Sequence, residues 1–215
     1  MSSAFCRLLS CVRVVVITIA LGGCAGHSDF MTKAPAVPVA PVENSATVVF
    51  IRDSGFAYAV NFAILDQAGN FLGDAVASSH FAIQVPPGRY FFFARGGEST
   101  DAIQAEVGAG YLYHVRVIPR IGMWLAGVEL DPIKPGEKEW PHLASWLART
   151  NHLSPLIPKV PVGVSGGLPA WAATAWATLS AAEQATRTLR PRDGVALDAR
   201  PKVHVAYAGE EALVE

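Results

Sequence analysis

Between residues 46 and 133 the chain repeats one pattern, in which short runs rich in valine, isoleucine, phenylalanine and tyrosine end at glycine or proline. Several runs alternate in side-chain character with a period of two residues, which is typical of strands with one buried face. Phe81, Ile83 and Val85 fall on one such face, and the residues between them fall on the other. The pattern predicts strands near Thr47–Arg52, Val60–Asp66, Asn70–Ala75, Phe81–Val85, Arg89–Arg95, Ala102–Val107, Tyr111–Ile118 and Met123–Leu130.

Tight turns separate the predicted strands. The loop Asp66–Asn70 contains Gly69, which can adopt the positive φ that a short hairpin loop needs. Gly88 and Gly110 close similar turns before the next strands. Short strands joined by such turns favour an antiparallel sandwich over a parallel α/β sheet. The run Tyr90–Phe93 is aromatic on both faces, which predicts a central strand that is covered on each side.

The last third of the chain has a different character. Trp140–Thr150 is expected to be a helix, with Pro141 in its first turn. A second, alanine-rich helix is expected from Ala170 to Leu189, ended by Pro191. The predicted fold class is therefore mainly β: an antiparallel β-sandwich with a C-terminal helical appendage.

The N-terminus has the parts of an export signal. Arg7 and Arg13 precede an apolar run, Val14–Leu21, that is much shorter than the roughly 20 residues of a membrane-spanning helix. The sequence Leu21-Gly22-Gly23-Cys24 follows and resembles the bacterial lipobox. The resemblance implies cleavage before Cys24, a diacylglyceryl thioether on its sulfur, and N-acylation by a chain such as palmitate. Ala25 stands where an aspartate would retain a lipoprotein in the inner membrane, so the expected location is the outer membrane, facing the periplasm.

The segment after Cys24 is rich in proline and alanine. Pro35, Pro38 and Pro41 favour an extended polyproline-II tether that would hold the folded domain away from the membrane. The expected organisation is a signal peptide (residues 1–23), the lipidated Cys24 with its tether (24–45), a β-sandwich domain (46–133), a helical appendage (134–190) and a poorly ordered tail (191–215). The other two cysteines, Cys6 and Cys11, would leave with the signal, so no disulfide or cysteine metal site is expected.

The strand region also resembles a known kind of module. The segments on which the resemblance rests are Phe50-Ile51-Arg52, Asp66 to Gly73, Val85-Pro86-Pro87-Gly88-Arg89-Tyr90 and Gly110-Tyr111-Leu112-Tyr113-His114-Val115. Over Thr47–Leu130 they resemble β-sandwich lipoproteins of unknown function that look like PEGA and carboxypeptidase-regulatory-type modules. The resemblance implies a sandwich that binds or braces, with no assigned chemistry.

One motif suggests catalysis. Gly163-Val164-Ser165-Gly166-Gly167 fits the G-x-S-x-G pattern of a serine hydrolase, and Asp198 and His204 follow in the chain order of such a triad. That motif requires a parallel sheet and a central strand before it, whereas the preceding run contains Pro158 and Pro161. A flexible loop is the preferred interpretation, and an envelope hydrolase that uses Ser165 is the alternative.

Histidine and tryptophan residues complete the candidates. The six histidines, His27, His80, His114, His142, His152 and His204, show no metal-ligand spacing, and no cofactor or metal site is expected. His114 and Arg116 could line a polar groove, although an exposed sheet face is the preferred interpretation. The tryptophans could form a sugar-stacking or membrane surface. They are expected instead to seal helices onto the sheet, with Trp146 and Trp171 covering Phe91–Phe93.

Charge excludes one class of partner. The formal net charge is -1 and no lysine or arginine cluster forms a stripe, so nucleic acid is not an expected ligand. The sequence predicts a non-enzymatic envelope protein, anchored in the membrane through Cys24, that binds or scaffolds a protein or cell-wall partner. A sensor or inhibitor of a secreted enzyme remains a further alternative.

Overall fold

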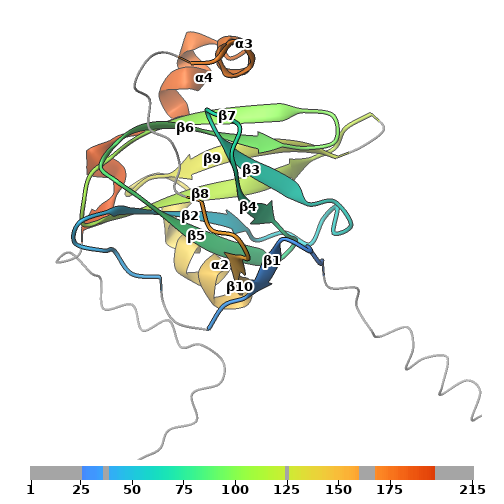
Figure 1. Cartoon of the computed structure of the whole chain (residues 1–215), viewed down its shortest axis with the longest axis horizontal. Coiled ribbons are helices and arrows are strands. Elements are labelled where there is room, and N and C mark those ends of the chain that lie inside the picture. The colour runs from blue at the N-terminus through green and yellow to red at the C-terminus, as the bar shows by residue number, and fades with distance from the viewer. Residues whose placement is uncertain (1–25, 36–38, 124–125, 160–167, 197–215) are drawn as a thin grey trace, which may run out of the picture.

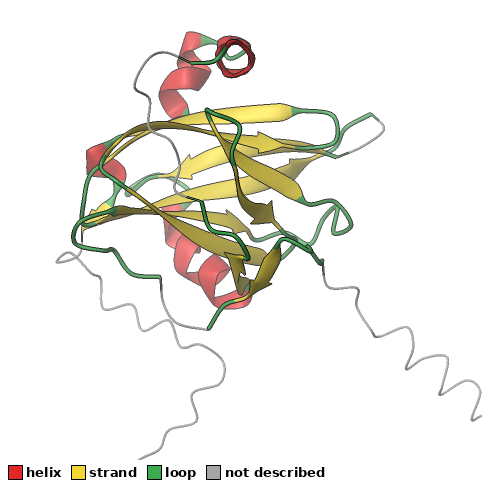
Figure 2. Cartoon of the chain, in the orientation of Figure 1, coloured by secondary structure: helices red, strands yellow, loops and turns green. Residues whose placement is uncertain are grey.

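The computed structural model describes residues 26–35, 39–123, 126–159 and 168–196, which form two facing β-sheets with short helices outside them (Figures 1 and 2). One sheet has the order β1-β10-β5-β2-β8, and both β9 and β12 pair with β8. Its strands are β1 (Met31–Lys33), β2 (Ala46–Arg52), β5 (Ser79–Val85), β8 (Tyr111–Arg120), β9 (Gly127–Ile133), β10 (Asn151–Pro155) and β12 (Val195–Ala196). The other sheet has the order β11-β7-β6-β3-β4. Its strands are β3 (Phe62–Asp66), β4 (Phe71–Ala75), β6 (Gly88–Arg95), β7 (Thr100–Val107) and β11 (Thr188–Leu189).

The expected class, a mainly β sandwich with helices in the C-terminal region, is confirmed, although both sheets are mixed. Most neighbours are antiparallel, but β2 pairs with β8, β5 with β10 and β7 with β11 in parallel. The β2–β8 pair arises because the chain crosses between the sheets several times. It returns through the β7–β8 turn at the end where β2 begins, so β8 runs in the direction of β2.

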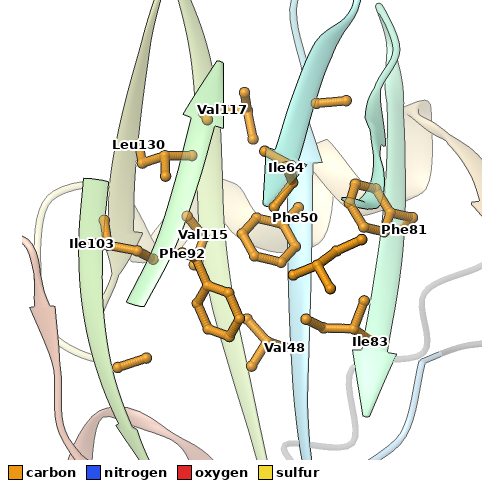
Figure 3. Packing of buried hydrophobic residues seen from close by; sticks show 14 of the residues in the cluster. Val48, Phe50, Ile64, Phe81, Ile83, Phe92, Ile103, Val115, Val117 and Leu130 are labelled. Carbon is orange, nitrogen blue, oxygen red and sulfur yellow. The ribbon is translucent and has the colours of Figure 1, made fainter. Parts of the chain in front are cut away.

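Apolar side chains from alternate positions of both sheets fill the space between them (Figure 3). Phe50 on β2 contacts Phe92 of the opposite sheet edge-to-face, with ring centroids 5.6 Å apart, and stacks on Phe81 at 5.3 Å. Each of these phenylalanines is buried, and burial of such a side chain contributes about 1.5–3 kcal/mol. The period of two in the sequence thus defines this core.

A helix covers the outer face of the first sheet. The predicted helix over Trp140–Thr150 is confirmed as a 3-10 turn, η1 (Trp140–His142), followed by α2 (Leu143–Arg149). Leu143 and Trp146 pack on Val49 and Ile51 of β2. Because β2 is covered on both sides, all of its residues are buried.

The second predicted helix, Ala170–Leu189, is wrong as a single element. It divides into α3 (Ala170–Ala177) and α4 (Ala181–Thr186), and the chain then enters β11. The Ser180 hydroxyl accepts a hydrogen bond from the Glu183 backbone N–H, and the Glu183 carboxylate accepts one from the Ser180 backbone N–H, which is the capping box of a new helix. A helix start in the middle of the alanine-rich run therefore divides it.

The two tryptophans expected on one face lie on different sheets. Trp171 contacts Phe93 at 4.7 Å, as predicted, whereas Trp146 covers the first sheet. The second tryptophan on the face of Phe91–Phe93 is Trp176, which lies edge-to-face with Phe91 at 5.1 Å. Strand β6 is central in its sheet and buried on both faces, as the aromatic run predicted.

Part of the expected C-terminal tail is ordered. Residues Pro191–Asp193 form a 3-10 turn, η2, and β12 pairs with Leu112 and Tyr111 of β8. Residues 197–215 lie outside the described part of the chain. The appendage is therefore joined to the first sheet as well as to the second.

Candidate functional site

The segment that follows Cys24 packs along one open side of the sandwich. Ser28 Oγ donates a 2.6 Å hydrogen bond to the Asp74 carboxylate on the edge strand β4, and the Asp74 backbone N–H lies 3.3 Å from the sulfur of Met31. Met31 is buried in the main core, and β1 pairs antiparallel with β10. Residues 26–33 therefore close the gap between the two sheets, which corrects the expectation that the whole of 24–45 is a free tether.

This docking begins at the first described residue. A Cβ added to Gly26 would lie 3.0 Å from Val76 Cγ1 and 3.2 Å from Ala77 Cβ, so the chain already runs against the domain there. Asn61 adds a hydrogen bond to the His27 carbonyl at 2.7 Å. Cys24 lies outside the described residues; in the sequence it stands two positions before Gly26. Two residues of chain span at most about 7 Å.

A buried arginine holds the loop beside the N-terminal segment. Arg52, at the end of β2, is 0% exposed and stacks 4.6 Å over the Phe62 ring. Burial lowers the pKa of Arg52 to about 10, which still leaves it charged at neutral pH. Its guanidinium donates to four backbone carbonyls, those of Phe56 (2.8 Å), Ala57 (2.8 Å), Val60 (2.6 Å) and Ala75 (3.0 Å).

The loop held in this way displays aromatic side chains to solvent. Phe56 and Tyr58 are each 52% exposed although the backbone around them is fixed by Arg52. Ala57 between them has a φ of 53°, a left-handed conformation that is uncommon for a residue with a side chain. The 53–61 loop is thus a braced loop with an apolar tip.

The β8–β9 connection presents a second apolar tip. Ile121 is 89% exposed and Met123 is 85% exposed. The Met123 backbone N–H donates to Glu98 at 2.7 Å, and Arg120 pairs with Glu129 across the base of the hairpin. Trp124 and Leu125 lie outside the described residues, so the strand predicted from Met123 is seen only from Gly127 onward.

Both tips lie at the end of the sandwich where the described chain begins, ahead of β1 (Figure 1). The sheet register fixes this relation, because Ile51 pairs with Arg116 in the parallel β2–β8 ladder. Strand β8 then continues to Arg120, three residues beyond the level of Arg52. At about 3.3 Å per residue, the hairpin starts about 10 Å further out than the 53–61 loop. We call these two tips together the apolar loop end.

An open hollow of about 380 Å³ lies behind the hairpin, on the side of the sandwich opposite the N-terminal segment. Arg187, which precedes β11, pairs there with Asp101 of β7 and donates to the Leu130 carbonyl at 3.0 Å. Asp101 also accepts from the Leu130 backbone at 2.6 Å, and burial raises the pKa of its carboxyl. The ion pair between Arg187 and Asp101 thus closes the second side of the sandwich.

A polar layer lies between α2 and the first sheet. Arg116 donates to both Asp53 oxygens, at 2.8 and 3.1 Å, and its guanidinium lies 4.2 Å from the Trp146 ring. Burial works against the charge of Arg116, but the hydrogen bond and charge of Asp53 outweigh it and raise its pKa. This face was expected to be exposed. It is instead covered by α2, so that His114 is buried and Arg116 is largely enclosed.

The buried histidines of this layer are held neutral. Thr150 Oγ donates to the Trp146 carbonyl at 2.8 Å, so His80 Nδ1, also 2.8 Å away, donates to Thr150. Burial lowers the pKa of His80 and of His114 to about 4, and neighbouring histidines add to the effect. Neutral histidines between a helix and a sheet contribute to packing at neutral pH.

The remaining candidate residues from the sequence form no site within the described part of the chain. Ser165, Asp198 and His204 lie outside the described residues. Within the described ranges, no group of three histidine, cysteine or carboxylate side chains could hold a metal ion. In the same part of the chain, no helix is long and apolar enough to cross a membrane.

Fold and site together define a small β-sandwich whose two open sides are closed by its own terminal segments. Comparison with known proteins finds no matching protein family, no matching curated protein and no matching solved structure. The resemblance to PEGA-like modules therefore stays a prediction.

Proposed function

We propose that this protein is a lipid-anchored component of the bacterial cell envelope, which acts as a non-enzymatic binding or scaffolding module on the periplasmic side of the outer membrane. The observation that supports the proposal best is the docking of residues 26–33 on the sandwich, because Cys24 stands only two positions before Gly26 in the sequence. An anchor at Cys24 would fix the domain to the membrane as one body rather than at the end of a long tether.

The buried polar side chains support a binding role because they take part in structural contacts. Asp53 binds Arg116, Asp101 binds Arg187, and Arg52 binds backbone carbonyls. These interactions hold loops and helices in place, which a scaffold requires.

The sheet edges indicate how a partner would bind. Strand β4 is covered by the N-terminal segment, and β1 offers only three residues. On the β9 edge, backbone N–H groups already donate to the side-chain oxygens of Ser99 and Asp101. A partner that added a strand would find little free backbone, so we expect an envelope protein or cell-wall component to bind a face of the domain.

Crosslinking in intact cells, followed by affinity purification and mass spectrometry, tests the proposal. A Cys24→Ala form with its signal intact is the control. A dominant envelope partner that is captured with the acylated protein and lost with Cys24→Ala is the expected result. Equal capture of cytoplasmic proteins by both forms would contradict it.

A further inference from the structure

We propose that the apolar loop end is seated on the phospholipid monolayer that holds the acyl chains of Cys24, with the 53–61 loop and the side chains of Ile121 and Met123 in contact with lipid. This inference rests on the proposed lipid anchor and adds the orientation of the domain and the surface that meets the membrane.

The first argument is the short distance to the anchor. Gly26 packs against Val76 and Ala77, and Asn61 ties His27 to the end of the 53–61 loop. Acyl chains on Cys24 would therefore be attached three residues, at most about 10 Å of chain, from the His27 carbonyl that binds this loop. A domain anchored there has this end near the lipid.

The second argument is the chemistry of the end itself. Phe56, Tyr58, Ile121 and Met123 are exposed by half or more, on the loops that project furthest in this direction. Transfer of exposed aromatic and aliphatic side chains to the boundary between headgroups and acyl chains lowers the free energy. In water they would remain an unfavourable surface.

The third argument is that the 53–61 loop cannot easily withdraw these side chains. Arg52 binds the carbonyls of Phe56 and Ala57 directly, and Ala57 keeps a left-handed conformation. A loop that is free to collapse would bury Phe56 against the domain. The brace instead fixes the backbone that carries the exposed Phe56 side chain, so little backbone ordering entropy is lost when the loop enters lipid.

A protein occupant fits this end less well. With acyl chains only two residues from Gly26, a folded protein domain would have to fit between this end and the monolayer that holds the anchor. Lipid is the partner that the anchor itself brings to the site.

Single cysteines test the orientation, because acylation of Cys24 leaves the mature chain with no other thiol. Tyr58→Cys and Met123→Cys place a label at the two tips. Ala109→Cys places the same label in the exposed β7–β8 turn, at the opposite end of the sandwich. Each purified, acylated protein is labelled with an environment-sensitive dye and reconstituted in phosphatidylethanolamine–phosphatidylglycerol vesicles, with and without bromine on the acyl chains.

Brominated lipid is expected to quench the labels at positions 58 and 123 at least twofold, and to leave the label at 109 unchanged. Equal quenching at all three positions, or none, in a protein with acylated Cys24 would overturn the orientation alone. Labels at 58 and 123 that are shielded from iodide but not quenched by brominated lipid would place a second copy over this end and also overturn it. An unmodified Cys24 in the same preparation would overturn the proposed function itself.

Discussion

Ser28 donates a 2.6 Å hydrogen bond to Asp74, 46 residues later in the chain, and so joins the N-terminal segment to the edge of the second sheet. Both residues are buried, and burial raises the pKa of the Asp74 carboxyl despite this bond. Residues 26–33 are thus part of the folded unit.

Removal of this bond should destabilise the whole domain. Ser28→Ala would leave the Asp74 carboxylate without its hydroxyl donor, and we expect a loss of about 1–3 kcal/mol in the free energy of unfolding. Urea denaturation measures it. Thr32→Ala on the exposed side of β1 is the matched control. Equal midpoints for the two variants would show that the segment is not coupled to the fold.

Arg52 should tolerate no substitution, not even by lysine. Lysine cannot donate to four carbonyls at once, and its amine is more strongly hydrated than a guanidinium. We expect Arg52→Lys to cost about 3 kcal/mol or more and to speed amide exchange in residues 54–61. Arg89→Lys, at an exposed position of β6, should change neither quantity. Unchanged exchange in the loop of Arg52→Lys would contradict the bracing role.

The buried histidines predict a loss of stability in mild acid. Their folded-state pKa of about 4 lies below the ordinary value of 6.5, so the unfolded chain binds more protons between these values. Stability due to these histidines is complete above pH 6.5 and falls as the pH drops towards 4. Two such groups give a slope of up to about 2.7 kcal/mol per pH unit.

Unfolding free energies between pH 6.5 and 5 check this slope, since Asp74, Asp101 and Asp131, whose pKa values burial raises, act with the opposite sign nearer pH 4. His114→Gln should reduce the slope by about one proton. A slope that His114→Gln does not alter would show that His114 is not buried in the neutral form.

Ser165 provides the test of the enzyme alternative. We expect the mature protein to resist a fluorophosphonate probe, because Pro158 and Pro161 precede the motif where a hydrolase would have a central strand. Gel fluorescence compares the protein with Ser165→Ala and with a heat-denatured sample. Specific labelling that is lost in Ser165→Ala would contradict the non-enzymatic proposal.

The sequence predicts strands well where two-residue periodicity and turn residues agree. All eight predicted strands occur, because alternation such as Phe81, Ile83 and Val85 reflects burial on one face. The parallel β2–β8 pair could not be predicted, since it depends on the path between sheets rather than on local pattern. Strand β10 was missed for a similar reason: Asn151–Pro155 has little apolar character and is stabilised by pairing with β5 and β1.

The candidate site was less accessible from sequence. The role of Arg52 depends on carbonyls of the 53–61 loop and of Ala75 at the end of β4, and nothing near Arg52 in the chain marks it. One signal was present, namely apolar residues in loops, as in Phe56-Ala57-Tyr58 and Ile121-Gly122-Met123. Such residues in turn positions indicate a surface that meets another phase or partner.

Mass spectrometry of the mature N-terminus is the most direct test of the central claim. The protein is purified from membranes of its bacterial host, and its N-terminal peptide is compared with that of Cys24→Ala. The account predicts a chain that begins at Cys24 and carries a diacylglyceryl group, with an amide-linked acyl chain where the host adds one. A mature membrane-fraction protein with an unmodified N-terminus, or with residues before Cys24 retained, would contradict it.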